Sequence, residues 1–414
     1  MLGRLGRADL TQQGKLRPLK APAVAIQVTA QPPIGAVIHE MEQLRCDTCG
    51  KMFTAPTPPE AGLEKYEASV GVMVGLLRYG SGLPFYRLER LQQSLGVPLP
   101  SSVQWEQADR VARALQPVLD HLIYLAAQSA LVFNDDTTMR VAALRKEIQA
   151  ETHPKRTGLF TSGIVSQTED HPIALFFTGR AHAGENLAGV LDHRDAQRAP
   201  PLHMGDGLAR NTPKGHRTLD CNCNVHARRN FVDIHGSFPE ECARVIESFA
   251  AIYRVEARAK DDGLGPQERL ALHQAQSQPV MDQLKAWFTE QIDARKVEPN
   301  SGLGQAIAYM QDRWTALTQF LRVPGAPLDN NVTERILKTA ILHRKNSLFY
   351  RTQRGAAVGD LFMSLVQTSR ANQVNPFDYL LAVVRNAESA KANPERWMPW
   401  NYQINLPEHT AGSG

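Results

Sequence analysis

The spacing of apolar residues changes near residue 129, and the two sides of that point predict different secondary structure. Between residues 64 and 128 apolar residues recur every three or four positions, which predicts helices separated at Pro and Gly. Ser101 and Gln104 have the spacing of a capping box, so we expect a helix to open there. Two helices joined by the short turn before Ser101 are typical of a helix-turn-helix, although ordinary helix packing gives the same pattern.

Beyond residue 129 the pattern favours strands. Three β-rich runs cover residues 129–144, 157–166 and 171–179, and two shorter runs, 200–206 and 217–224, predict further strands. Residues 184–193 predict a helix. From residue 225 to 320 the helical period returns, with interruptions at 261–268 and 296–304. We therefore predict a mixed α/β core with a long helical block inserted before the last core helix.

Composition narrows the class of protein. The chain has 414 residues, 43% hydrophobic and 21% charged, which is typical of a globular protein of roughly two to three domains and excludes collagen-like and wholly disordered chains. Its net charge of +4 mildly favours polyanionic partners. No apolar run approaches the ~18 residues of a membrane helix. The first residues lack the apolar segment of a secretory signal, and five cysteines favour a reducing cytosol.

Three carboxylates stand where a metal site could form. Asp135 and Asp206 each follow an apolar, strand-forming run, and Glu334 lies in the first turns of a helix that Asp329 or Asn330 could cap. A carboxylate at the end of a buried strand is costly unless it is hydrogen-bonded, paired or bound to a cation. Such acids are suitable ligands for a pair of divalent metal ions. The alternative is that each acid is an ordinary cap or surface charge, because spacing alone does not show that they converge.

A basic stretch follows Glu334. It is interleaved with the aromatic residues Phe349 and Tyr350. A stripe of this kind could grip a phosphate backbone, whose counterions are released on binding; the alternative is a solvated basic face. Its basic members are Arg335, Lys338, Arg344, Lys345, Arg351 and Arg354.

Four blocks of the chain together resemble the insertion sequence 66 family of transposases. PLDNNVTERILKTAILHRKNSLFY (327–350) is similar to the family's C-terminal signature, and NDDTTMRV, MGDGLARN and CNVHARRNF match its earlier motifs in the same order. In the first of these motifs Asp136 stands where the family usually has glutamate, which leaves Asp135 in the catalytic place. The similarity spans roughly residues 37–385. It implies a ribonuclease H-like core, a DDE triad of Asp135, Asp206 and Glu334, and two Mg²⁺ ions with Mn²⁺ able to substitute.

Cysteines mark a departure from that family. The alternating segment before Cys46 predicts a short strand, and Cys46-x-x-Cys49 supplies one pair of zinc ligands where the family carries two pairs. Structural zinc takes four ligands, so we expect either a shortened N-terminus or a decayed finger, with zinc binding at Cys46 and Cys49 left open. For Cys223 and His226 we expect a structural role near the active site, and for Cys242 a place in the core.

The resemblance implies Mg²⁺-dependent cleavage of DNA at the element ends and strand transfer into target DNA. Arg335, Lys338, Arg344 and Lys345 are the residues expected to contact DNA. The expected partners are the terminal repeats, the target duplex, a second copy in a homodimer or larger synaptic assembly, and helper proteins of the element, with no membrane. The protein would be cytoplasmic in a bacterium and associated with the nucleoid when bound to DNA. The alternatives are a catalytically silent DNA-binding remnant and a metal-dependent nuclease without strand transfer.

Six segments are predicted in order. They are a basic arm with a partial zinc-finger-like part (1–62), a helical, helix-turn-helix-like region (63–128), the first part of the catalytic core (129–224), a helical insertion (225–326), the last part of the core with the Glu334 helix (327–387), and a C-terminal tail (388–414).

Overall fold

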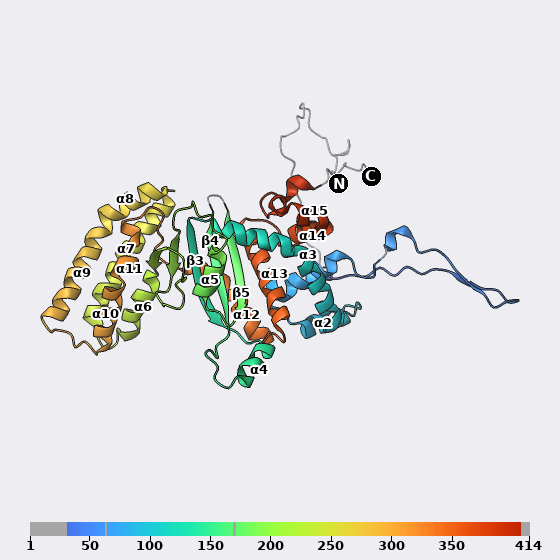
Figure 1. Cartoon of the computed structure of the whole chain (residues 1–414), viewed down its shortest axis with the longest axis horizontal. Coiled ribbons are helices and arrows are strands. Elements are labelled where there is room, and N and C mark those ends of the chain that lie inside the picture. Colours follow the sequence, from blue (N-terminus) through green and yellow to red (C-terminus); the bar gives the residue numbers. More distant parts are fainter. Residues whose placement is uncertain (1–30, 63, 169–170, 407–414) are drawn as a thin grey trace, which may run out of the picture.

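A five-stranded mixed sheet lies at the centre of the protein (Figure 1), in a computed structural model that describes residues 31–62, 64–168 and 171–406. Its order is β5-β4-β3-β6-β7. Strands β3, β4 and β5 pair antiparallel, whereas β3, β6 and β7 pair parallel. The strands are β3 (Leu131–Thr138), β4 (Phe160–Gln167), β5 (Pro172–Gly179), β6 (Leu202–Gly205) and β7 (Leu219–Asn222).

The five strands predicted beyond residue 129 are therefore confirmed, with one correction. The first β-rich run, predicted to reach residue 144, ends at Thr138, and its last three residues open helix α4 (Ala142–Ala150). Leu144 and Ile148 in this part have the i, i+4 spacing of a helix face and are both buried. The predicted basic arm falls mostly on residues 1–30, which lie outside the described residues.

Neighbouring residues of β4 contact helices on opposite faces of the sheet. A side chain at Gly163 would meet Leu337 at 3.0 Å, so glycine lets α12 (Asn331–Ser347) approach one face closely. On the other face the Asn186 amide of α5 (Ala183–Leu191) donates to Ser162 Oγ at 2.8 Å. Because successive strand residues alternate between faces, this pair defines an α12 face and an α5 face.

Helix α13 (Gln353–Ala371) covers the edge strand β5 by acting as a substitute strand. Its side chains meet alternate β5 residues: Asp360 and Ser364 accept the amides of Thr178 and Phe176 at 2.7 and 2.9 Å. Four helical residues rise about 6 Å, which is close to the rise of two strand residues. Every fourth side chain of α13 therefore meets every second residue of β5. Thr368 and Asn372 continue the series at Ala174 and Pro172.

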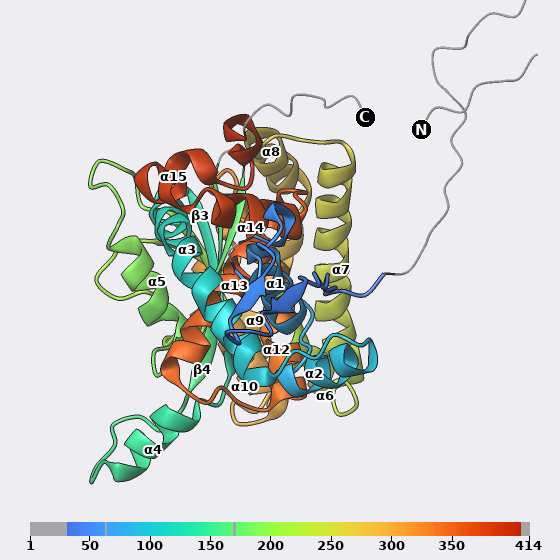
Figure 2. The ribbon, with the colours of Figure 1, turned by 90° about the vertical axis from the view of Figure 1, so that its right-hand side faces the viewer.

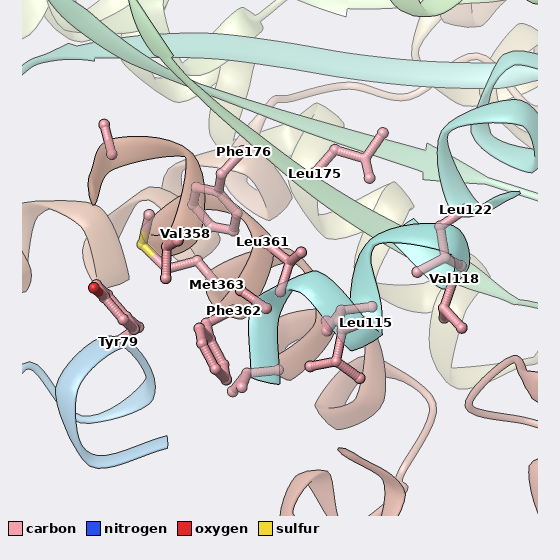
Figure 3. Packing of buried hydrophobic residues seen from close by; sticks show 14 of the residues in the cluster. Tyr79, Leu115, Val118, Leu122, Leu175, Phe176, Val358, Leu361, Phe362 and Met363 are labelled. Carbon is pink, nitrogen blue, oxygen red and sulfur yellow. The ribbon is translucent and has the colours of Figure 1, made fainter. Parts of the chain in front are cut away.

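The predicted helices between 64 and 128 are α1 (Ala68–Gly75), α2 (Phe85–Ser94) and α3 (Ser101–Ala127), with a π-helical turn (Leu76–Gly80) after α1. They pack with α13, α14 (Pro376–Arg385) and α15 (Ala387–Ala392) around a core in which Tyr79, Leu115 and Phe362 are buried (Figure 3). The capping box at Ser101 is wrong, because Ser101 Oγ bonds to Glu89 and Gln104 bonds to backbone carbonyls. The position where the helix opens is confirmed.

The segment predicted to be helical from residue 225 is helical, and it packs with strands β3, β4, β6 and β7 around a second hydrophobic core in which Cys242 is buried as expected. It lies at the β7 end of the sheet (Figure 1). Its helices are α6 (Asn224–Ile234), α7 (Pro239–Asp261), α8 (Pro266–Gln276), α9 (Gln278–Asp293), α10 (Gly302–Asp312) and α11 (Trp314–Leu317). In the part of the chain that the structure describes, no helix combines the length and apolar character needed to span a bilayer.

Candidate active site

Asp135 and Asp136 are adjacent on β3 and point to opposite faces of the sheet. Asp135 lies opposite Gly163, on the α12 face, and Asp136 lies opposite Ser162, on the α5 face. There Asp136 accepts a hydrogen bond from His182 Nδ1 at 2.8 Å, and Arg210 lies 3.9 Å away. Of the two acids, Asp135 is therefore the one that faces the helix carrying Glu334.

Asp206 lies level with Asp135 on the neighbouring strand. Leu131–Phe133 of β3 pair with Leu202–Met204 of β6, and the same register carried two residues further places Asp206 beside Asp135. Its carboxylate accepts from Leu208 N at 2.9 Å and from Asn211 Nδ2 at 3.2 Å. These bonds hold the side chain at the end of the strand.

Glu334 approaches from the first turn of α12. Asp329 Oδ1 accepts the Asn331 amide at 3.2 Å, whereas the Asn330 side chain makes no cap and instead donates to Asn134 O at 2.9 Å. Asn330 therefore fastens the start of α12 to β3, one residue before Asp135. His226 Nε2 of α6 lies 3.9 Å from Glu334 Oε1.

The electrostatics of Asp135 reflect this crowding. Burial raises the pKa of Asp135 to about 7, the hydrogen bond from the Asp136 amide opposes the rise, and the negative charges of Asp206, Asp136 and Glu334 add to it. The charges of Asp206 and Glu334 affect this pKa because both carboxylates are near enough to repel the ionised Asp135. Within the described ranges, however, no three His, Cys, Asp or Glu side chains are close enough together to hold a metal ion. The shared metal pair therefore stays a prediction.

Comparison with known proteins bears on this cluster of acids. Residues 65–358 match the family described as Transposase IS66 family, a stretch that includes Asp135, Asp206 and Glu334. The chain belongs to the IS66 family of transposases. It is also 25%, 24% and 26% identical to three uncharacterized proteins of Sinorhizobium fredii, y4jD, y4hP and y4qI. These matches cover 86%, 87% and 80% of this chain and 71%, 67% and 61% of the relatives, so the chain spans about two thirds of their length.

The IS66 family block around Cys223 serves to position α12. Cys223 is buried, and its sulfur accepts the Asn330 amide at 3.4 Å. Asn224 Nδ2, at the start of α6, donates to the Leu328 carbonyl at 3.2 Å. Together with His226 beside Glu334, these contacts give the motif the structural place near the acids that its sequence led us to expect.

A buried polar network under the acids has no sequence signature. Asn134 Oδ1 lies 2.9 Å from His203 Nε2, and Asn134 Nδ2 donates to Asn211 O at 2.7 Å. Asn211 also donates to Asp206, and Asn330 donates to the Asn134 carbonyl, so one residue, Asn134, links the segments that carry all three acids through its side chain and its backbone. His182, the partner of Asp136, was missed for the same reason: its contacts come from distant parts of the chain.

The basic residues after Glu334 divide into two groups. Arg335, Lys338 and Lys345 are exposed on one face of α12. Arg344 lies elsewhere, because its guanidinium donates to Thr137 Oγ1 at 3.1 Å and to Thr138 Oγ1 at 2.6 Å, at the end of β3. Arg351 is exposed, whereas Arg354 forms an ion pair of 2.7 Å with Asp109 of α3. The sequence predicted one continuous basic stripe. In the structure only Arg335, Lys338 and Lys345 on the exposed α12 face, together with Arg351, remain of it.

Cys46 and Cys49 lie in the turn of a small hairpin, β1 (Gln43–Arg45) and β2 (Met52–Thr54), which extends away from the body (Figure 1). The Gly50 amide bonds to Cys46 O at 2.9 Å with Gly50 at φ 72°. Hydrogen bonds from Cys49 and Thr48 lower the pKa of the Cys46 thiol. The turn brings the pair together, and zinc binding there stays a prediction.

Proposed function

We propose that this IS66 family chain is a DDE transposase that cleaves DNA at the ends of its element and joins them to target DNA, with Asp135, Asp206 and Glu334 as the catalytic acids. The observation that carries the proposal is geometric: half-buried Asp135 lies on the α12 face, in register with Asp206 at the end of the neighbouring strand and facing the helix that carries Glu334. The strand order, with three antiparallel strands followed by two parallel ones, supports a ribonuclease H-like core.

The donor set fits divalent cations by its chemistry. Three carboxylates offer the oxygen ligands that Mg²⁺ prefers. A cation among them would offset the burial and the repulsion that together raise the pKa of Asp135. Asp135, Asp206 and Glu334 would be the residues that hold the ions. Bound there, the two ions would supply activation of the attacking oxygen and stabilisation of the leaving oxygen.

The chain's own residues would provide placement. Asn134 and Asn330 hold β3 against the start of α12, Asn211 holds the Asp206 carboxylate, and the exposed face of α12 presents Arg335 and Lys338 beside Glu334. These cations would bind the backbone phosphates on either side of the bond to be broken, which positions DNA without reading its sequence.

The test is cleavage of a duplex that carries the terminal repeat of the encoding element, in Mg²⁺ and in EDTA. Asp135→Asn should abolish Mg²⁺-dependent cleavage while leaving DNA affinity in EDTA largely intact, because affinity comes mostly from phosphate contacts. The matched control is Asp136→Asn, which removes a neighbouring charge on the α5 face and should still cleave. Cleavage by Asp135→Asn at the parental rate would refute the assignment.

A second step separates transposase from nuclease. A duplex with its 3′-hydroxyl already exposed is incubated with a supercoiled plasmid, and joined product is measured. Joining that requires Asp135 supports the transposase; Asp135-dependent cleavage without joining would establish a metal-dependent nuclease instead.

We predict that the exposed face of α12 contributes to DNA affinity without contributing to sequence choice. Lys345→Ala should weaken binding by the same factor on terminal-repeat and random duplexes, and should lower the slope of log affinity against log salt by about one. The control is Lys391→Ala, an exposed lysine of α15. An unchanged affinity and slope for Lys345→Ala would mean that this face is only solvated surface.

A further inference from the structure

An arm projects from the strand that carries Asp135. Strands β3 and β4 pair along their whole length, from Leu131 opposite Gln167 to Thr138 opposite Phe160. Two residues would be enough to close such a hairpin, yet residues 139–159 lie between the strands. We call these residues the α4 arm; Figure 2 shows α4 standing away from the body.

The α4 arm is fixed at its base. Met139 N donates to Leu159 O, and the Tyr350 backbone exchanges bonds of 2.8 Å with Arg140 O and Ala142 N. On the side toward α5, Glu151 pairs with Arg180 at 2.6 Å, and Arg156 pairs with Glu185. With Leu144 and Ile148 buried as well, the arm has a set direction relative to the acids.

The other side of the arm bounds a basic hollow. The hollow has a volume of about 510 Å³, and among its lining residues are three arginines and no acid. Its lining comes from the arm, the end of β3, the start of β4 and the end of α12: Thr138, Met139, Arg140, Arg145, Gly158, Leu159, Phe160, Arg344 and Leu348. An adjoining hollow of about 350 Å³ shares Arg140 and Arg145 with it.

The charges of these three arginines are not neutralised by neighbouring carboxylates. Arg344 donates to Thr137 and Thr138, which are uncharged. Arg140 and Arg145 are exposed, and neither forms an ion pair with any residue that the structure describes. A guanidinium presents a planar fork of N–H donors that matches a phosphate, so three of them around one open hollow form a site for an anion with several oxygens.

We propose that this hollow binds a backbone phosphate of the DNA held at the acids, a role that rests on the proposed function. Thr138, at its edge, lies three strand residues beyond Asp135, about 10 Å at 3.3 Å per residue. A DNA strand advances about 3.4 Å per nucleotide along the helix axis. The α4 arm therefore grips the backbone within a few nucleotides of the bond that faces Asp135.

The experiment measures binding in EDTA, where catalysis does not contribute. A labelled 30-base-pair duplex of random sequence is titrated with the full chain at several salt concentrations. The variant Arg140→Ala/Arg145→Ala should bind about tenfold more weakly or worse, and its salt slope should fall by about one, the contribution of one phosphate contact. The matched control is Arg254→Ala/Arg258→Ala, which removes two exposed arginines from α7.

Three results would overturn the proposal: unchanged affinity and slope in the arm variant, weaker affinity with an unchanged slope, or an equal loss in the α7 control. The last would show that only net charge matters. Thermal unfolding of each variant checks that the fold is kept, and Arg145→Gln, which keeps a polar side chain, repeats the test with a milder change. If the arm variant binds normally while cleavage still needs Asp135, the arm proposal fails and the proposed function stands; if no duplex binds the parent chain, both fail.

Discussion

His343 is a buried histidine whose replacement gives a sharp test of the packing between α12 and the N-terminal helices. Its ring is fully buried and stacks between Tyr350, at 4.3 Å between centroids, and Tyr79, at 5.9 Å. Neither ring nitrogen has a hydrogen-bond partner among the residues that the structure describes. Burial, with a smaller effect of the nearby Arg78 cation, lowers the pKa of His343 from 6.5 to about 3.

Because the pKa of His343 is lower in the folded protein than in the unfolded chain, the protein becomes less stable as the pH falls. The unfolded chain binds a proton at His343 near pH 6.5 and the folded chain does not until about pH 3, so stability is lost as pH falls between these values. At about 1.4 kcal/mol per pKa unit, the loss from this one residue is about 2 kcal/mol at pH 5 and about 3 kcal/mol at pH 4. The variant His343→Phe keeps an aromatic ring of similar shape in the stack and abolishes that loss.

The assay is urea unfolding of parent and variant at pH 8, 7, 6, 5 and 4, with the difference in unfolding free energy plotted against pH. The difference should be nearly constant from pH 8 to 7 and should then favour His343→Phe progressively. His235→Phe, at the exposed residue that directly follows α6, is the control and should not show this trend. Parallel curves for parent and His343→Phe would mean that the folded protein accommodates the charged ring, and the reasoning would be refuted.

Two further predictions concern contacts that hold the core and the sheet edge. Gly75→Ala should lower the unfolding free energy by about 2 kcal/mol or more, because the new methyl carbon would lie 2.1 Å from the Phe362 ring. Adding Phe362→Leu should recover part of this loss. If denaturant titrations showed that the costs of the two substitutions simply add, the clash would be contradicted. Thr368→Val keeps the side-chain shape but removes the hydroxyl that bonds to Ala174 N and O at 3.1 Å. The unfolding free energy should therefore fall by about 1–3 kcal/mol. An unchanged denaturation midpoint would show that α13 does not act as a substitute strand.

Sequence alone predicted most of the elements and named the three acids as the candidate site. Strands β3 to β7 and the helical insertion follow from local periodicity, because alternation with period 2 and recurrence near 3.6 record which faces are buried. Asp135, Asp206 and Glu334 were identified because they belong to short motifs whose residues are adjacent in the chain. Those motifs also indicated the IS66 transposase family, which the comparison confirmed.

Tertiary structure decided which of these residues meet. Residue spacing did not predict that Asp136 turns toward His182 while Asp135 faces α12, because that depends on which helix covers which face of β4. Other features likewise depend on partners up to 245 residues away in the chain. They are the end of β3 at Thr138, the hydrogen bonds that hold Arg344 there, and the ion pair of Arg354 with Asp109. Contacts over such separations leave no periodic mark in a sequence, since they are made by single side chains whose partners are set only when the sheet and its helices pack.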